Sequence, residues 1–247
     1  MTGDHGQQYW NQLGALDPDI AVIDPADTKG LKSRYISDLR DEAFRIGLAR
    51  HGVYRGDVLD FGCGTGSSSI PLLRHGHRVV GLDIANALLT HAKARHRHDS
   101  ALWVQIDGRR LPLRDRAFDA AICYVVLSYV TDDATVIDLL RQLRNALRPQ
   151  APMLILEQVR SRRALVEQGR KIHRSVHEWT RLLEVAGFID VSPRVLRHGR
   201  FPMIPLIRQG LIPKRFWPFI RRLEALTGKT CGVLPWDYAE VLFDARA

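Results

Sequence analysis

Apolar residues in the middle of the chain form short runs that alternate with amphipathic stretches of helical period. The runs predict five strands, and the stretches between them predict helices over 67–75, 85–96 and 132–147. This alternation is typical of a mainly parallel sheet with helices on both faces. The five expected strands are Val58–Phe61, Arg78–Asp83, Ala101–Ile106, Phe118–Tyr124 and Pro152–Glu157.

Further elements are expected on either side of this core. A loosely structured arm reaches to about Lys29, and a helix follows over 31–50. Ser175 and Glu178 form a capping-box pattern that opens a helix ending at Gly187. Two more strands are expected over 189–196 and 238–244. The Pro-rich segment between these two strands contains a short amphipathic helix, with one face formed by Phe219, Ile220, Leu223 and Leu226 and the other by Arg221 and Arg222.

A glycine-rich turn follows the first predicted strand, in the sequence Val58-Leu-Asp-Phe-Gly-Cys-Gly-Thr-Gly66. Glycines let the backbone turn sharply and approach a ligand closely. The G-x-G-x-G spacing differs from the dinucleotide fingerprint, and no Lys-Ser/Thr pair follows as in a phosphate-binding loop. Asp60, just before the glycines, suits a cationic or hydroxyl-bearing ligand.

Two more acids end neighbouring strands of the predicted sheet. Asp83 ends the second strand, where a carboxylate accepts hydrogen bonds from a ribose diol. Asp107 follows the third strand, where a carboxylate would accept a hydrogen bond from an adenine amino group. Together with Asp60 and the glycines, these acids indicate a nucleoside ligand without phosphates, and S-adenosylmethionine is the leading candidate.

Residues 58–157 resemble the class I S-adenosylmethionine-dependent methyltransferases, in particular those acting on small molecules and glycans. The resemblance rests on Leu59–Gly66, Gly81–Ile84, the Asp107–Leu113 stretch followed by Phe118-Asp119, Leu147-Arg-Pro149 and Leu183–Phe188. It implies a Rossmann-like sheet of seven mostly parallel strands, with the last strand antiparallel. The segment over 200–236 is longer than this fold needs, so a helical cap that forms a lid over the substrate is expected between strands six and seven. The cofactor-binding residues that the resemblance implies are Arg34, Asp60, Gly62, Cys63, Gly64, Gly66, Asp83, Ile84, Asp107, Gly108 and Tyr124.

A single domain is expected over 1–247. It divides into an N-terminal arm and helix (1–50), a cofactor-binding core (57–196), a cap (200–236) and a last strand (238–245). Arg34 has two interpretations, as the partner of the cofactor's carboxylate or as one more surface arginine. Tyr9 and Trp10 either fold over the active site or only anchor the arm.

The acceptor is expected to be a hydroxyl group of a small molecule or glycan, for which a general base is useful. Candidates for catalysis are His173, Glu157 and Tyr129, with Ser128 beside the last. In the competing interpretation, Ser175 and Glu178 only cap a helix and His173 is a solvated side chain.

The net charge of +9 is confined to one part of the chain. Residues 148–247 hold 18 Lys and Arg against 9 Asp and Glu, whereas the rest is balanced. The excess fits an anionic or lipid-linked substrate, a peripheral membrane contact or plain solvated surface. An alternative function is RNA methylation, although no stable nucleic acid partner is expected. The three cysteines lack metal-ligand spacing and no signal peptide is evident, so a cytoplasmic protein without a metal is expected.

Overall fold

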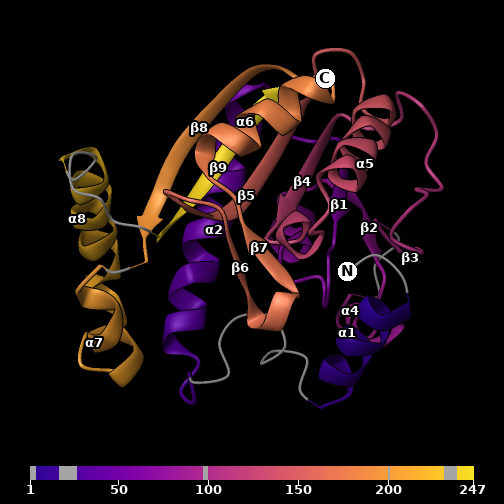
Figure 1. Cartoon of the computed structure of the whole chain (residues 1–247). Helices are drawn as coiled ribbons and strands as arrows, with labels where there is room; N and C mark the ends of the chain where they lie inside the picture. The colour runs from indigo at the N-terminus through magenta and orange to yellow at the C-terminus, as the bar shows by residue number, and fades with distance from the viewer. Residues whose placement is uncertain (1–3, 17–26, 97–99, 200, 231–237) are drawn as a thin grey trace.

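A seven-stranded sheet forms the centre of the molecule (Figure 1). The computed structural model describes residues 4–16, 27–96, 100–199, 201–230 and 238–247. The strand order is β3-β2-β1-β4-β5-β9-β8, and β9 runs antiparallel to both β5 and β8. The predicted fold class is confirmed. The strands of this sheet are β1 (Asp57–Phe61), β2 (Arg78–Asp83), β3 (Ala101–Gln105), β4 (Ala120–Tyr124), β5 (Pro152–Arg160), β8 (Ile189–His198) and β9 (Tyr238–Arg246).

Alternate residues of each central strand serve two separate cores, because successive side chains point to opposite faces of the sheet. On one face Leu59 and Phe61 pack in a cluster with residues of α5 (Asp133–Ala146) and α6 (Val176–Val185). On the other face Val58 packs with residues of α2 (Leu31–Arg50) and α3 (Ser69–Arg74). The expected capping box forms at α6, and the Asp132 side chain caps α5 through the Thr135 N–H.

The N-terminal segment is a helix, so the expectation of a loosely structured arm was wrong over the described residues. This helix, α1 (Asp4–Leu16), lies against α4 (Asn86–Arg95). The Asn11 side chain accepts a hydrogen bond from the Ala87 N–H at 3.0 Å, and the Gly14 carbonyl lies 3.1 Å from His91 Nε2. The rest of the expected arm, over 17–26, lies outside the described residues.

A small hairpin that the sequence pattern did not predict follows β5. It consists of β6 (Ala164–Val166) and β7 (Lys171–His173), joined through the 3-10 turn η2 (Glu167–Gly169). β7 contacts a second 3-10 turn, η1 (Leu127–Tyr129), which follows β4. Each of these elements has only three residues, too few for apolar periodicity to reveal.

The segment between β8 and β9 contains α7 (Met203–Gln209), η3 (Lys214–Phe216) and α8 (Trp217–Thr230). These elements lie at the β8 side of the sheet and pack on α2 through a cluster that includes Tyr35, Trp217 and Ile220. The sequence predicted that Phe219 and Ile220 share an apolar face of α8 and that Arg221 lies on the opposite, polar face, and this was wrong. Ile220 is buried whereas Phe219 is exposed, and Arg221 turns inward to Asp38 and Glu42 on α2. The predicted cap also includes residues 200 and 231–236, which lie outside the described residues.

Candidate functional site

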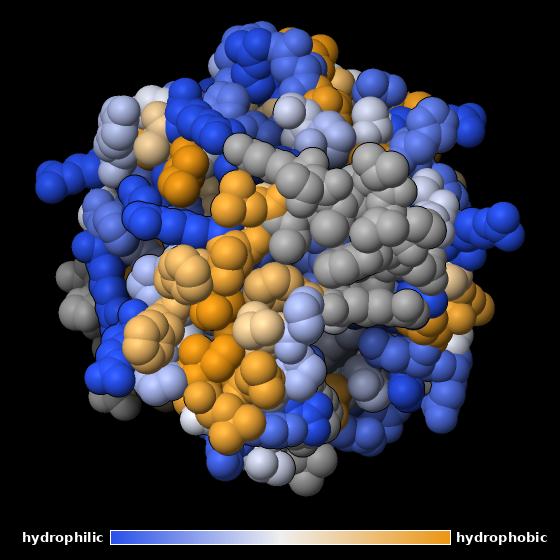
Figure 2. Space-filling view, turned by 90° about the vertical axis from the view of Figure 1, so that its left-hand side faces the viewer, coloured by the Kyte–Doolittle hydropathy of each residue, from blue (hydrophilic) through white to orange (hydrophobic). Residues whose placement is uncertain are grey.

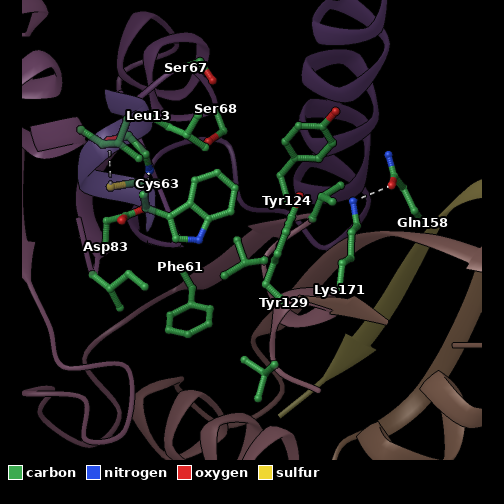
Figure 3. Close-up of a pocket in the computed structure, with 18 of the residues that line it drawn as sticks. Leu13, Phe61, Cys63, Ser67, Ser68, Asp83, Tyr124, Tyr129, Gln158 and Lys171 are labelled. Carbon is green, nitrogen blue, oxygen red and sulfur yellow. Dashed lines mark hydrogen bonds between the residues drawn. The ribbon is translucent and has the colours of Figure 1, made fainter. Parts of the chain in front are cut away.

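A cavity of about 560 Å³ lies at the carboxyl ends of the parallel strands, within the usual range for small-molecule sites. Residues that end or follow β1, β2, β3 and β4 line it, together with side chains from α1, α2 and the β6–β7 hairpin. Figure 3 shows Asp83 and Cys63 on one side of this space, and Tyr129, Lys171 and Gln158 on the other. The strand-end rule therefore located the cavity correctly.

The glycine turn after β1 forms one wall of the cavity. Gly62 and Gly64 have φ angles of +73° and +53°, a left-handed conformation that side chains disfavour. A Cβ at Gly62 would come within 2.2 Å of the Val126 side chain, so β1 and the turn after β4 approach closely there. A Cβ at Gly64 would meet nothing within 4 Å, and this position faces the cavity.

Asp83 lies at the end of β2 with its carboxylate fixed by the backbone. The Gly64 N–H donates to Oδ2 and the Ala85 N–H to Oδ1, both at 2.8 Å. Burial raises the pKa of Asp83 to about 6, against the opposing effect of these hydrogen bonds. The side chain lines the cavity, so it remains able to accept hydrogen bonds from a ligand diol.

Asp60 is buried beside the cavity, and its carboxylate is directed to α3. The hydroxyls of Ser68 and Ser69 donate to its Oδ2 at 2.7 and 2.6 Å. Burial raises its pKa. Asp60 therefore fixes the start of α3 against the glycine turn, and Ser68 takes the place at the cavity wall.

The other predicted cofactor residues fall into two groups. Cys63, Ile84, Gly108 and Tyr124 line the cavity with Gly62, Gly64 and Asp83. Arg34, Gly66 and Asp107 do not line it. Arg34 is exposed, and Lys32 and Ile36 are the α2 residues at the cavity.

Asp107 and Gly66 have structural partners instead. The Asp107 carboxylate accepts hydrogen bonds from the Arg109 and Arg110 N–H groups, at 2.7 and 2.8 Å, which lower its pKa. Gly66 packs against the ring of Trp103, where a Cβ would come within 2.8 Å.

Lys171, on β7, is one of the charged cavity residues that the sequence analysis did not predict; the others are Lys32, Glu167, Arg170, Arg197 and Glu240. Lys171 is buried and lines the cavity, and its ammonium donates to Gln158 Oε1 at 2.8 Å. Nζ lies 4.8 Å from the centre of the Tyr129 ring and 3.8 Å from Glu167 Oε1. Burial lowers the pKa of Lys171, which favours the neutral amine. Nothing in the sequence separates this lysine from its exposed basic neighbours.

Tyr129 faces the cavity from η1, as the sequence predicted for a catalytic candidate. Its hydroxyl lies 3.5 Å from Glu167 Oε1, and its ring and that of Trp10 form an edge-to-face pair with 4.9 Å between centroids. Burial raises the pKa of Tyr129 above its usual value, with Glu167 adding to the effect. The phenol is therefore neutral, and it can position an acceptor by hydrogen bonding.

Glu157 and His173, the other two catalytic candidates, do not line the cavity. Glu157 is fully buried, and its Oε1 accepts hydrogen bonds from the Leu127 and Ser128 N–H groups at 2.9 and 3.3 Å. Burial raises its pKa. His173 is buried in β7, where its Nδ1 accepts a hydrogen bond from Arg160 Nε at 3.1 Å. Glu157 thus stabilises η1, which carries Tyr129, and His173 stabilises β7, which carries Lys171.

The cover of the cavity comes from α1 and the hairpin. Tyr9, Trp10 and Leu13 of α1 line it, which answers the question left open for the two aromatic residues. The Arg170 guanidinium lies over the Tyr9 ring at 4.6 Å and links the hairpin to α1. None of the described residues over 201–230 lines the cavity, so the expectation that this segment encloses the substrate was wrong for them.

The basic cluster between Arg160 and Arg174 is largely used inside the protein. Arg174 is fully buried and donates to Asp133 and to the Val130 carbonyl. Arg163 pairs with Asp133 and Glu178, and Lys171 lies in the cavity. Arg174 and Lys171 are therefore turned away from any nucleic acid backbone, whereas Arg162 and Arg163 are exposed.

Comparisons with known proteins agree with this geometry. The profile of a family described as a methyltransferase domain matches residues 58–150. The ubiquinone biosynthesis O-methyltransferase of Hahella chejuensis is 37% identical over 86 residues, covering 32% of this chain and 35% of the relative. The N-demethylindolmycin N-methyltransferase of Streptomyces griseus is 27% identical over 101 residues, covering 40% and 43%. The chain thus spans about two-fifths of the length of the curated relatives that it matches.

A solved structure covers almost the whole chain. It is the geranyl diphosphate C-methyltransferase of Streptomyces coelicolor A3(2) in complex with Mg²⁺, geranyl diphosphate and S-adenosyl-L-homocysteine. The TM-score is 0.65 at 17% identity, and the match covers 97% of this chain and 96% of the other. The resemblance predicted from the sequence is confirmed: residues 58–150 form a class I S-adenosylmethionine-dependent methyltransferase domain.

Proposed function

We propose that this chain transfers the methyl group of S-adenosylmethionine to a hydroxyl group of a small molecule. The observation that carries the proposal is a single cavity with two unlike ends. The glycine turn and Asp83 form one end, and Tyr129, Gln158 and the buried Lys171 form the other. Such a cavity holds a cofactor and an acceptor together, out of bulk water.

The residues at the first end fit the cofactor of this class. Gly64 leaves room at the wall, Asp83 presents a carboxylate for the ribose hydroxyls, and Ile84 and Ile106 give apolar surface for a base. Lys32, rather than Arg34, is the cation of α2 placed to meet the cofactor's carboxylate. Bound S-adenosylmethionine supplies an activated methyl group, so orientation alone can contribute about 7–11 kcal/mol to lowering the barrier.

At the second end, we assign Lys171 as the group that accepts the acceptor's proton. Burial lowers the pKa of this amine and so eases the loss of its proton, and Gln158 Oε1 accepts a hydrogen bond from Nζ that holds it in place. A positioned general base typically adds 10²–10⁴-fold to the rate. Tyr129, neutral because its pKa is raised, orients the acceptor beside Lys171. This arrangement replaces the sequence-based candidates His173 and Glu157, which lie outside the cavity lining.

The relatives named above methylate nitrogen, oxygen and carbon, so they do not indicate one acceptor. The residues that line the cavity are the guide to its chemical class. Arg170 and Lys171 lie at the acceptor end, which supports a phosphorylated or lipid-linked acceptor. Glu167 lies beside them, however, and favours a neutral polyhydroxyl or phenolic molecule. Turnover of matched neutral and phosphorylated acceptors at low salt distinguishes the two.

The cofactor half of the proposal is tested by calorimetric titration with S-adenosylmethionine and S-adenosylhomocysteine. We expect micromolar binding, weakened at least tenfold by Asp83→Ala because two ligand hydrogen bonds are lost. Absence of binding by folded protein would overturn the proposal.

The catalytic half is tested on Lys171 with a phenolic acceptor found by screening. Lys171→Met should lower kcat about 10²–10⁴-fold and leave S-adenosylhomocysteine affinity unchanged. Lys171→Arg keeps the positive charge but cannot lose its proton near neutral pH, so it should be equally impaired. In the wild type, kcat should rise with pH as the amine deprotonates. Full activity of Lys171→Arg would show that the cation, not proton transfer, matters.

A further inference from the structure

The outer side of α7, η3 and α8 exposes a concentration of large apolar side chains. Figure 2, which views the molecule from this side, shows apolar residues gathered in a band edged by hydrophilic ones. Leu211 is 65% exposed, Phe219 58%, Leu226 57% and Phe216 47%. We call these four residues, with Leu206 and Leu223, the α7–α8 apolar face.

Packing within the chain does not account for this face. The inner side of the same helices is a separate set, in which Ile207, Trp217 and Ile220 are buried against Tyr35 and Ile36 of α2. Within the described part of the chain, these helices thus carry apolar residues on two sides, and the inner side is the one buried against α2. Contiguous exposed apolar surface of this kind marks an interaction site.

Exposed cations surround the apolar face, and no exposed acid lies among residues 201–226. Arg208, Lys214, Arg215 and Arg222 are exposed. Between residues 201 and 226 the one acidic residue is Glu224, which is buried and accepts a hydrogen bond from the Tyr35 hydroxyl at 2.8 Å. The Arg215 guanidinium lies 5.0 Å from the Phe216 ring centre, so charge and aromatic surface meet at the same place.

We propose that the α7–α8 apolar face docks on a bilayer that contains anionic lipid. Apolar and aromatic residues bordered by Lys and Arg are the composition of helices that lie in the membrane interface. Within the described residues no helix is long and apolar enough to span a bilayer. A second copy of the chain, related by a two-fold axis, would place the four cations opposite each other and is disfavoured.

The docking face is separate from the cavity, since none of its residues lines that space. Membrane binding and cofactor binding are therefore independent properties. The proposal does not rest on the proposed methyl transfer, and each can fail without the other. Docking would bring the chain to an acceptor that is itself held in the lipid surface.

Vesicle co-sedimentation tests the proposal, using phosphatidylcholine vesicles with and without phosphatidylglycerol. We expect the wild type to bind the phosphatidylglycerol vesicles, and to bind less as salt rises. The double variant Phe216→Ser/Phe219→Ser should lose at least tenfold in affinity. Lys214→Gln, Arg215→Gln and Arg222→Gln should each lose roughly fivefold. The matched control is Tyr54→Ser/Leu102→Ser, at two residues 70% and 58% exposed elsewhere, and it should bind like the wild type.

Four results would overturn this proposal. The wild type fails to bind either vesicle, or the Phe216→Ser/Phe219→Ser variant binds as well as the wild type. In the third, light scattering shows a dimer that the Phe variant abolishes, with no vesicle binding, and the face then contacts a second copy. Binding of RNA in place of vesicles would assign the cations to nucleic acid. Calorimetry with S-adenosylhomocysteine should give equal affinities for the wild type and the Phe variant, which shows that the variant is folded.

Discussion

Gly64 and Gly52 can be compared to separate the effect of a side chain at the cavity wall from the effect of backbone strain. Gly64 and Gly52 both have positive φ, at +53° and +73°, and a Cβ at either would meet nothing within 4 Å. Gly64 lines the cavity, whereas Gly52 lies in the turn after α2. Alanine should therefore cost about 1–2 kcal/mol of stability at each position.

The two variants should differ in ligand binding. Gly64→Ala places a methyl group against the cofactor and should weaken S-adenosylhomocysteine binding at least tenfold, whereas Gly52→Ala should leave it unchanged. Thermal unfolding gives the stability and calorimetric titration gives the affinity. Equal affinities for the two variants would mean that the ligand does not approach Gly64.

Side-chain direction explains which site residues could be predicted from the sequence. Asp83, Ile84 and Gly108, which were predicted to bind the cofactor, line the cavity, because the apolar runs in the sequence show where the strands end. Asp60 and Asp107 also lie near strand ends of the same sheet, but their carboxylates have partners within the protein. Serine hydroxyls donate to Asp60, and backbone N–H groups donate to Asp107. These local partners depend on where α3 begins and how the turn after β3 closes, and neither is visible in spacing alone.

At the scale of elements, the attachment of α8 to α2 depends on a buried acid. Glu224 accepts a hydrogen bond from Tyr35 and lies 3.6 Å from Arg197, and burial raises its pKa from 4.5 to about 7. The folded state therefore holds this proton more tightly than the unfolded state. Its contribution to stability is fully present below pH about 4.5 and is lost as pH rises through about 7.

Glu224→Gln removes this titration and keeps a side chain of similar shape. We expect the free energy of unfolding of the variant to depend less on pH between about 5 and 8 than that of the wild type. Urea unfolding at several pH values measures the slope. Asp132→Asn is the control, since this exposed acid has a lowered pKa and titrates below that range. An unchanged slope in Glu224→Gln would show that Glu224 does not titrate in this window.

The elements that the sequence did not predict are those that complete the acceptor end. Lys171 and Tyr129 belong to a three-residue strand and a three-residue 3-10 turn, and Trp10 to a helix at the chain's N-terminal end. The strands of the sheet were predicted from short apolar runs, and the helices around it from an amphipathic period that repeats over many residues. Short elements derive their structure from contacts across the fold, such as that between Trp10 and Tyr129. The part of the cavity formed at the strand ends was therefore largely predictable, and the part formed by the short elements was not.

At the scale of the whole molecule, the cofactor should stabilise the fold to an extent that depends on pH. A ligand at 100 times its Kd stabilises a protein by about 2.7 kcal/mol, which corresponds to a rise in Tm of roughly 5–10 °C for a chain of this size. Asp83 must be ionised to accept both ribose hydrogen bonds, and its pKa is about 6. At a fixed S-adenosylhomocysteine concentration, the ligand-induced rise in Tm should thus be greatest above pH about 7 and should become smaller as pH falls through 6.

Because this pH dependence should come from Asp83, a variant of Asp83 can be compared with a variant of Asp107. Asp83→Asn should show a smaller rise in Tm that no longer changes across this pH range. Asp107→Asn should keep the pH dependence of the wild type, because the pKa of Asp107 is lowered and its carboxylate is charged throughout. Differential scanning fluorimetry with and without ligand provides the measurement. If Asp107→Asn alone abolished the pH dependence, the ribose contact would have been assigned to the wrong acid, and the orientation of the cofactor in the cavity would have to be reversed.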